Sequence, residues 1–204
     1  MGDAALRGQH DDFGARDCHR MTEALEQTQI VVRPLPATLA VAIAGSLRAP
    51  SKSKTLAERM LAELESLGCA THLIDVAELP AEALVARAEA GEIAEAMAAV
   101  GRARIVIASS PTYRALYTGV MKCFFDLMPQ EHLAGKICIG LQTGIATQHA
   151  LSPEYGMRPL FASLGGVPLG IIYGTDAEFI EGQPGDDLVS RVRQLSRAAV
   201  AAQA

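Results

Sequence analysis

Short apolar runs alternate along the chain with longer segments in which apolar residues recur every three or four positions. The first run, "LAVAIAG" at residues 39–45, is continuously apolar, which predicts a strand buried on both faces. Similar runs predict strands at residues 71–76, 103–110, 135–144 and 167–174. Because a helix-length segment separates each run from the next, the pattern predicts five β/α repeats.

The intervening segments have helical periodicity. The apolar stripes are formed by Leu56, Met60, Leu64 and Leu67 after the first strand, by Leu116, Val120, Phe124 and Leu127 after the third, and by Leu188, Val192 and Leu195 near the end of the chain. We expect the first helix to end at Gly68 and the alanine-rich region after the second strand to break near Gly91. A further helix is expected at about residues 154–164.

Five buried strands separated by helices predict a parallel sheet covered on both faces. A chain of 204 residues is too short for an ordinary eight-fold barrel. We therefore expect an α/β, three-layer, flavodoxin-like fold with a five-stranded parallel sheet. The strand order 2-1-3-4-5 is taken from comparison with that fold. Such sheets bind ligands beyond the carboxyl ends of their strands, which directs attention to the loops after residues 45, 109 and 143.

Residues 1–36 show no sustained period and carry charges throughout. We expect them to form an N-terminal extension, with disorder as one option, ahead of a flavodoxin-like domain at residues 37–204. They lack the apolar core of a signal peptide, and no apolar run approaches the roughly 18 residues of a membrane span, so a cytoplasmic location is the default expectation. The net charge of −5 argues against a nucleic-acid partner, which is normally met by a cationic face.

Several familiar motifs are missing. The four cysteines form no CxxC and the five histidines have no metal-ligand spacing, so no metal site is expected. Neither GxxxxGK[ST] nor GxGxxG follows the first strand, and GxSxG is absent from the chain. The first loop therefore needs a different explanation.

That loop reads "GSLRAPSKS" at residues 45–53. Ser46, Ser51 and Ser53 can each donate a hydrogen bond, Arg48 can neutralise charge, and the following helix offers free N–H groups. Hydrogen bonds to a charged group contribute about 1.5–3 kcal/mol each, so four or five could hold a phosphate monoester. The alternative is a helix N-cap with a solvated basic rim.

A second loop, "SPTYRALYTG" at residues 110–119, opens with Pro111, whose fixed φ shapes the turn. It brings Thr112, Tyr113 and Arg114 to the carboxyl edge of the sheet. Their amides, hydroxyl and aromatic face suit a flat heterocycle with polar edges. The alternative for Tyr113 is a half-buried packing residue.

The third loop supplies Thr143 and Gly144, where the backbone can approach a ring closely. A phosphate at one end of the site and a flat ring at the other describe flavin mononucleotide (FMN).

These blocks resemble the NADPH-dependent FMN reductase family over about residues 39–173. The resemblance rests on "GSLRAPSKS", "SPTYRALYTGVMKCFFDLMP", "LAGKICIGLQTG" and "YGMRPLFASLGG". Within the family, the chain is most similar to reductases that supply reduced flavin to monooxygenases desulfonating organosulfonates. The resemblance implies FMN binding, NAD(P)H oxidation, a homodimer or homotetramer, and a flavin-dependent monooxygenase as a possible partner.

The resemblance also implies roles for individual residues. The FMN phosphate would be held by Ser46, Arg48, Ser51 and Ser53, and the isoalloxazine and ribityl portion would be contacted by Pro111, Thr112, Tyr113 and Arg114, with Thr143 and Gly144 on the other flank. The helix that carries Lys122 and Asp126 would lie in the dimer interface, and Tyr117 matches a tyrosine that sulfonate-linked members carry near that interface.

The implied reaction moves a hydride from nicotinamide C4 to flavin N5. No catalytic side chain is expected, because the cofactor carries the chemistry. Two alternatives stay open: an FMN-containing quinone or azo reductase on the same fold, and a flavodoxin-like electron carrier without NAD(P)H turnover. A charge of −5 is mild for an electron carrier of that kind.

Overall fold

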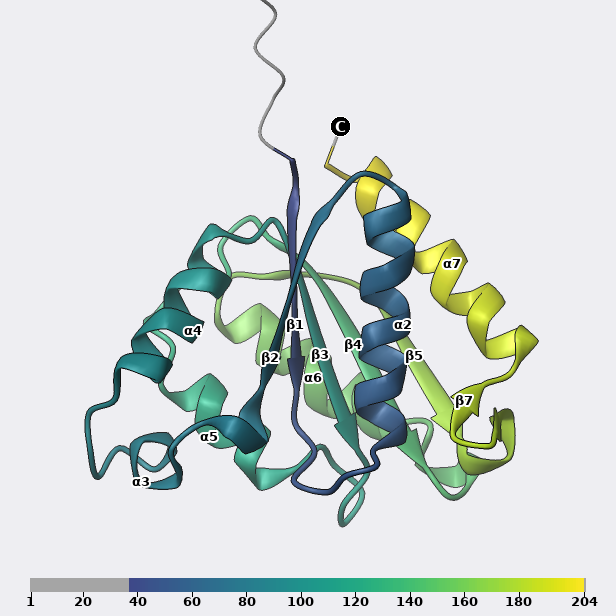
Figure 1. Ribbon diagram of the computed structural model, residues 1–204, viewed down its shortest axis with the longest axis horizontal. Helices are drawn as coiled ribbons and strands as arrows, with labels where there is room; N and C mark the ends of the chain where they lie inside the picture. The colour runs from purple at the N-terminus through teal and green to yellow at the C-terminus, as the bar shows by residue number, and fades with distance from the viewer. Residues whose placement is uncertain (1–36, 204) are drawn as a thin grey trace, which may run out of the picture. The chain divides into compact units, whose positions relative to one another are not determined.

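The computed structural model describes residues 37–203; the expected N-terminal extension at residues 1–36 lies outside this range (Figure 1). A parallel five-stranded sheet has the order β2-β1-β3-β4-β5, as expected. Its strands are β1 (Leu39–Ala44), β2 (Ala70–Asp75), β3 (Ile105–Pro111), β4 (Ile137–Gly144) and β5 (Val167–Thr175). Every strand carboxyl end therefore lies at the same edge of the sheet, the lower edge in Figure 1.

Helices cover both faces of this sheet (Figure 1). One layer consists of α2 (Lys52–Ser66) and α7 (Asp186–Ala201), and the other of α4 (Gly91–Arg102), α5 (Gly119–Asp126) and α6 (Ser152–Ser163). Within the described residues, no helix combines the length and apolar character that crossing a membrane requires.

Each helix layer has its own core. Met60 of α2 and Val192 of α7 are fully buried in the first. In the second, Phe124, Phe125 and Phe161 are buried, with the rings of Phe125 and Phe161 6.2 Å apart. Burying one such side chain contributes about 1.5–3 kcal/mol, so the two cores fix the helices that carry the loops of the carboxyl edge.

The end of α2 follows the sequence prediction in one respect and departs from it in another. Gly68 has a φ of 88° and donates to the carbonyl of Glu65, while Cys69 donates to Leu64, which together form a Schellman motif. Leu67 is the C-cap, not part of the buried stripe, and it is 38% exposed. The helical period that predicted its burial ends one residue earlier.

Two further differences concern short elements. The break near Gly91 is confirmed, because α3 (Ala81–Leu84) ends well before α4 begins at Gly91. Leu116 lies outside the helix that the sequence predicts for it, because α5 begins at Gly119, after the N-cap Thr118. A small hairpin of β6 (Phe179–Ile180) and β7 (Gln183–Pro184) was not expected, because two-residue strands have no detectable period.

Candidate functional site

Buried polar side chains are concentrated at the carboxyl edge of the sheet. Among the described residues, eight of the nine buried polar residues lie at the ends of β1, β3 and β4 or in the segments directly after them. They are Ser46, Ser53, Ser109, Ser110, Thr118, Gln142, Thr143 and Ser152. Burying a polar group is costly unless it is hydrogen-bonded, so such a concentration at one edge indicates a functional site.

The β1 loop (residues 45–51) is ordered by its own hydroxyl groups. The Ser46 hydroxyl bonds to the backbone N–H and carbonyl of Arg48, at 3.3 and 3.2 Å. Ser51 caps α2 by accepting from the backbone N–H of Lys54, and its oxygen lies 3.0 Å from that of Ser53. Arg48 is exposed. The structure thus contains the helix N-cap that the sequence also allowed as the alternative to a phosphate site. The Arg48 guanidinium lies at the surface beside this cap.

The β3 loop (residues 112–118) is joined to both of its neighbours. Thr118 donates through its hydroxyl to the carbonyl of Gly45 at 2.5 Å, which links this loop to the β1 loop. Its backbone N–H donates to the Ser110 hydroxyl at 2.9 Å. On the other side, the backbone N–H of Thr112 donates to the carbonyl oxygen of Thr143 at 2.7 Å, which links this loop to the end of β4. The predicted residues of all three loops are therefore brought together at one edge.

Tyr113 and Leu116 close a two-residue turn within the β3 loop. The N–H of Tyr113 donates to Leu116 at 2.8 Å, and the N–H of Leu116 donates back at 3.2 Å. The central residues Arg114 and Ala115 have φ values of 51° and 62°. Turns of this type normally carry Asn-Gly, because both central residues are left-handed. Arg114 and Tyr113 are consequently held at an exposed tip.

Replacing Ala115 with glycine is expected to stabilise the protein. The left-handed conformation costs a non-glycine residue about 1–2 kcal/mol, and glycine removes this strain. Glycine also loses more chain entropy on folding, which offsets about 0.5–1 kcal/mol of the stability gained. We expect the midpoint of thermal unfolding to rise by about 1–3 °C. The matched control is Ala98→Gly, in the exposed middle of α4, which should lower the midpoint. Two shifts of the same sign would contradict this account.

Gly144 leaves bare backbone at the end of β4. A Cβ at this position would collide with the hydroxyl oxygen of Tyr173 and lie 3.0 Å from Thr112 Oγ1. Tyr173 donates to the carbonyl of Ala146 at 2.9 Å and so fixes the start of the β4 loop (residues 145–151). Burial raises the pKa of the Tyr173 phenol above its usual value, against the opposing effect of a hydrogen bond with Thr112. The predicted close approach of a ligand to Gly144 is compatible with this geometry.

Sequence reasoning missed the polar residues beneath the loops. Ser109 and Ser110 end the buried strand β3, where Ser109 donates to the carbonyl of Ser53 at 2.7 Å. Gln142 is fully buried in β4. The available signal was a polar side chain inside an otherwise apolar run, as in "ASSP" and "GLQTG". Such a residue needs a partner when it is buried.

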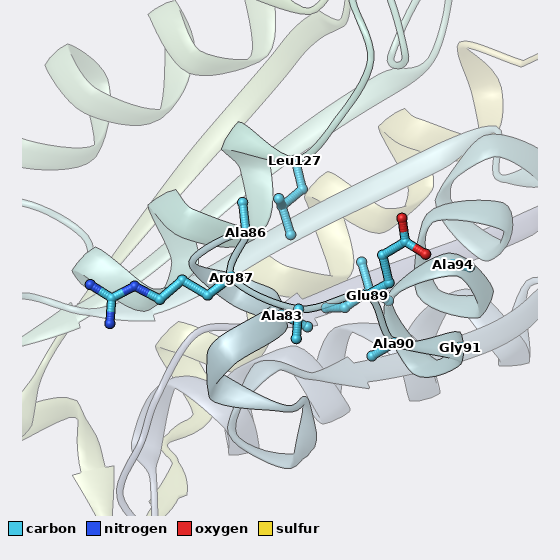
Figure 2. A pocket seen from close by; sticks show the side chains of 10 residues that line it. Ala83, Ala86, Arg87, Glu89, Ala90, Gly91, Ala94 and Leu127 are labelled. Carbon is cyan, nitrogen blue, oxygen red and sulfur yellow. The ribbon is translucent and has the colours of Figure 1, made fainter.

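A hollow of about 800 Å³ lies elsewhere, between α3, the start of α4 and Leu127 (Figure 2). None of its ten lining residues belongs to the three loops, and most are alanine or glycine. The side chains of Arg87 and Glu89 point to different sides in Figure 2. The hollow offers few convergent polar groups to orient a ligand, unlike the carboxyl edge.

Comparisons with known proteins find relatives of this chain among FMN reductases. The model of the family described as NADPH-dependent FMN reductase matches residues 38–178. The NADH-dependent FMN reductase SfnF of Pseudomonas fluorescens (strain Pf0-1) is 33% identical over 159 residues, which cover 75% of this chain and 85% of that protein. The apo crystal structure of an NADH:FMN oxidoreductase, EMOB, is 30% identical with a TM-score of 0.73, covering 80% of this chain and 88% of that one.

The fold has wider relatives. A flavodoxin of Streptococcus pneumonia TIGR4 superposes with a TM-score of 0.57 at 14% identity, over 81% of this chain and 99% of that one, which shows the shared fold alone. The fold is that of a flavodoxin-like protein, and the polar edge beyond β1, β3 and β4 is its candidate ligand site.

Within that class, the chain belongs to the NADPH-dependent FMN reductase family. It is an oxidoreductase whose flavin is FMN and whose electron donor is NAD(P)H.

Proposed function

We propose that the three loops of the carboxyl edge bind FMN, with its phosphate at the β1 loop and its ring at the β3 and β4 loops. The observation that carries this proposal is the concentration of buried polar side chains at that edge. The β1 loop lies at the N-terminus of α2, a 15-residue helix whose free N–H groups favour an anion. Gly144 has no side chain, and Tyr173 and Thr112 fill the place of its Cβ, so these residues would form one wall for a flat ring beside Thr143.

In this arrangement Ser46, Arg48, Ser51 and Ser53 hold the phosphate, and Pro111, Thr112, Tyr113, Arg114, Thr143 and Gly144 surround the ring and ribityl chain. When bound, FMN supplies the capacity to accept a hydride from NAD(P)H. The protein contributes orientation and exclusion of water, which together bring reacting atoms to about 3–3.5 Å. No acid or base in the site is assigned a proton transfer.

Titration with FMN tests the proposal directly. We expect quenching of flavin fluorescence and oxidation of NADPH or NADH only when FMN is present. Flavin binding without nicotinamide oxidation would favour the electron carrier. FMN retained through dialysis, together with fast quinone turnover, would favour the quinone or azo reductase. Absence of both quenching and oxidation would overturn the site itself.

We also propose that the chain forms a homodimer or homotetramer through an apolar surface beside the site. Its residues are Tyr113, Leu116, Ile145, Leu151 and Tyr155, which are 40–81% exposed. Leu116 lies against α6, because a Cβ at Gly156 would be 2.5 Å from its Cδ1. Exposed apolar surface of this kind often marks an interface. The family resemblance also implies that α5, with its exposed Lys122–Asp126 ion pair, lies in the subunit interface.

Replacing Tyr155 with glutamate is expected to dissociate the oligomer, because the 78% exposed ring would be exchanged for a charge within an apolar contact. Sedimentation velocity should show a shift toward monomer. The matched control is Ile180→Glu, on the β6–β7 hairpin, where a side chain of similar exposure (71%) lies outside this surface. A wild-type monomer, or equal dissociation by both variants, would contradict the assignment.

A flavin-dependent monooxygenase is the proposed consumer of reduced FMN, as the sequence resemblance implies. The exposed tip of the β3 loop supports this role, since the ring would lie where flavin can leave. The chain is proposed to act in the cytoplasm, where thiols such as those of Cys69, Cys123 and Cys138, which are unpaired, stay reduced.

A further inference from the structure

Gln142 joins two segments of the site through one buried amide. Its side chain is fully buried at the carboxyl end of β4. The amide nitrogen donates to Thr112 Oγ1 at 2.7 Å and to Ser152 Oγ at 2.8 Å. Thr112 begins the β3 loop and Ser152 begins α6. A single side chain therefore sets the distance between the loop and the helix.

The orientation of this amide follows from the cost of unmet hydrogen bonds. Gln142 Oε1 is buried and has no hydrogen-bond partner among residues 37–203. If the amide were reversed, two N–H donors would be unmet in place of one carbonyl oxygen, and buried N–H groups are left unpaired less often than C=O groups. The nitrogen is therefore the atom that faces the two hydroxyls. Thr112 Oγ1 receives a hydrogen from Gln142, and its own hydrogen must be donated elsewhere.

The other neighbours of Thr112 Oγ1 lie beside Gly144. The oxygen is 3.0 Å from the position that a Cβ of Gly144 would occupy, and the Tyr173 hydroxyl is also next to that position. Tyr173 uses its hydrogen for the carbonyl of Ala146. Thr112 is thus the donor of its side-chain hydrogen bond with Tyr173, which acts against the effect of burial on the pKa of that phenol.

We propose that Gln142 is a positioning residue for the flavin: it turns the Thr112 hydroxyl toward the Tyr173 oxygen beside Gly144 and fixes the β3 loop against α6. The inference rests on the proposed FMN site. The proposed ring site is formed by the segments that these bonds hold in place, and the groups around a flavin ring tune its electronic properties. Gln142 acts through Thr112.

Two substitutions of Gln142 separate its shape from its polarity. Gln142→Leu removes both donated hydrogen bonds and leaves a shorter, apolar side chain of similar bulk. Gln142→Glu can keep contact with both hydroxyls, but as an acceptor it turns the hydrogen of Thr112 inward. We expect both variants to bind FMN about 3- to 10-fold more weakly, as measured by fluorescence quenching, and to shift the visible bands of bound FMN. The inhibition constant of inorganic phosphate as a competitor of FMN, which reports the β1 loop alone, should be unchanged.

A double-mutant cycle tests whether Gln142 acts through Thr112. Thr112→Val should weaken FMN binding, and adding Gln142→Leu to it should weaken binding little further, because the bond is already lost. The matched control is Ser196→Ala, which removes a fully buried hydroxyl of α7 that donates to Val192 at 2.9 Å. It should alter neither the affinity nor the spectrum.

Several outcomes would overturn the inference. Additive effects in the cycle would show that Gln142 does not act through Thr112, and a Gln142→Glu variant with wild-type spectrum and affinity would refute the donor role. If Gln142→Leu does not fold, Gln142→Glu and Thr112→Val decide the matter. Failure of the wild type to bind FMN would overturn the proposed site and this inference together. Normal FMN binding by the wild type that is unchanged when Gln142 is replaced would overturn the inference alone.

Discussion

Replacing Arg48 with alanine is expected to weaken FMN binding by about 10- to 100-fold. A hydrogen bond to a charged group contributes about 1.5–3 kcal/mol, and each 1.4 kcal/mol corresponds to a factor of ten. Arg48 is exposed on the β1 loop, so its loss should leave the free energy of unfolding almost unchanged. FMN affinity and the KM for FMN should therefore change while thermal stability does not.

Riboflavin, which lacks the phosphate, provides the internal comparison for this variant. Its affinity should be the same for wild type and Arg48→Ala, because Arg48 is assigned to the phosphate alone. Arg87→Ala is the matched control, since it removes another exposed arginine outside the three loops. Wild-type FMN affinity in Arg48→Ala, or an equal loss of riboflavin and FMN binding, would refute the phosphate site.

Replacing Gly144 with alanine is expected to lower kcat/KM for FMN reduction by about 100-fold. The new Cβ would overlap the Tyr173 hydroxyl and approach Thr112 Oγ1 and Cβ at 3.0 and 3.2 Å. Both side chains, or the backbone between them, must move, and a displacement of about 1 Å in a reacting geometry can cost a factor of about 100. Steady-state NAD(P)H oxidation at varied FMN measures the effect.

The cause of this loss can be tested by removing the atom that the Cβ would strike. Tyr173→Phe in the Gly144→Ala background should restore part of the activity, although it sacrifices the bond to Ala146. Gly119→Ala is the matched control, because a Cβ there would meet nothing within 4 Å. If Gly144→Ala were as active as Gly119→Ala, the packing of Tyr173 and Thr112 against residue 144 would not control the reacting geometry.

The sheet could be predicted because most of its strands are predominantly apolar runs, and because α2, α5 and α7 have clear helical periods. The positions of Leu67 and Leu116 could not, since both continue a helical period past the real boundary. Leu67 lies where Gly68 ends α2, and Leu116 is held by its backbone pairing with Tyr113. Local hydrogen bonds decided both boundaries, and a hydrophobic pattern does not contain them.

Some residues of the candidate site could likewise be predicted from the sequence, and others could not. Residues on the loops could be named from their chemistry, because glycine, proline, hydroxyls and arginine are conspicuous after an apolar strand. Gln142 and Tyr173 could not be named, because their roles depend on which atoms of neighbouring strands they meet. Gln142 lies opposite Ser110 on one side and Tyr173 on the other only once the strand register is known.

The bond from Thr118 to Gly45 joins residues that are 73 positions apart. During synthesis, the β1 loop leaves the ribosome long before the loop that completes it, and Tyr173 follows much later still. A nascent chain can therefore present the helix end for an anion early, but it cannot enclose a ring until β5 has paired with β4. Flavin capture should consequently be a late event in biosynthesis, and chains truncated before β5 should not bind the ring.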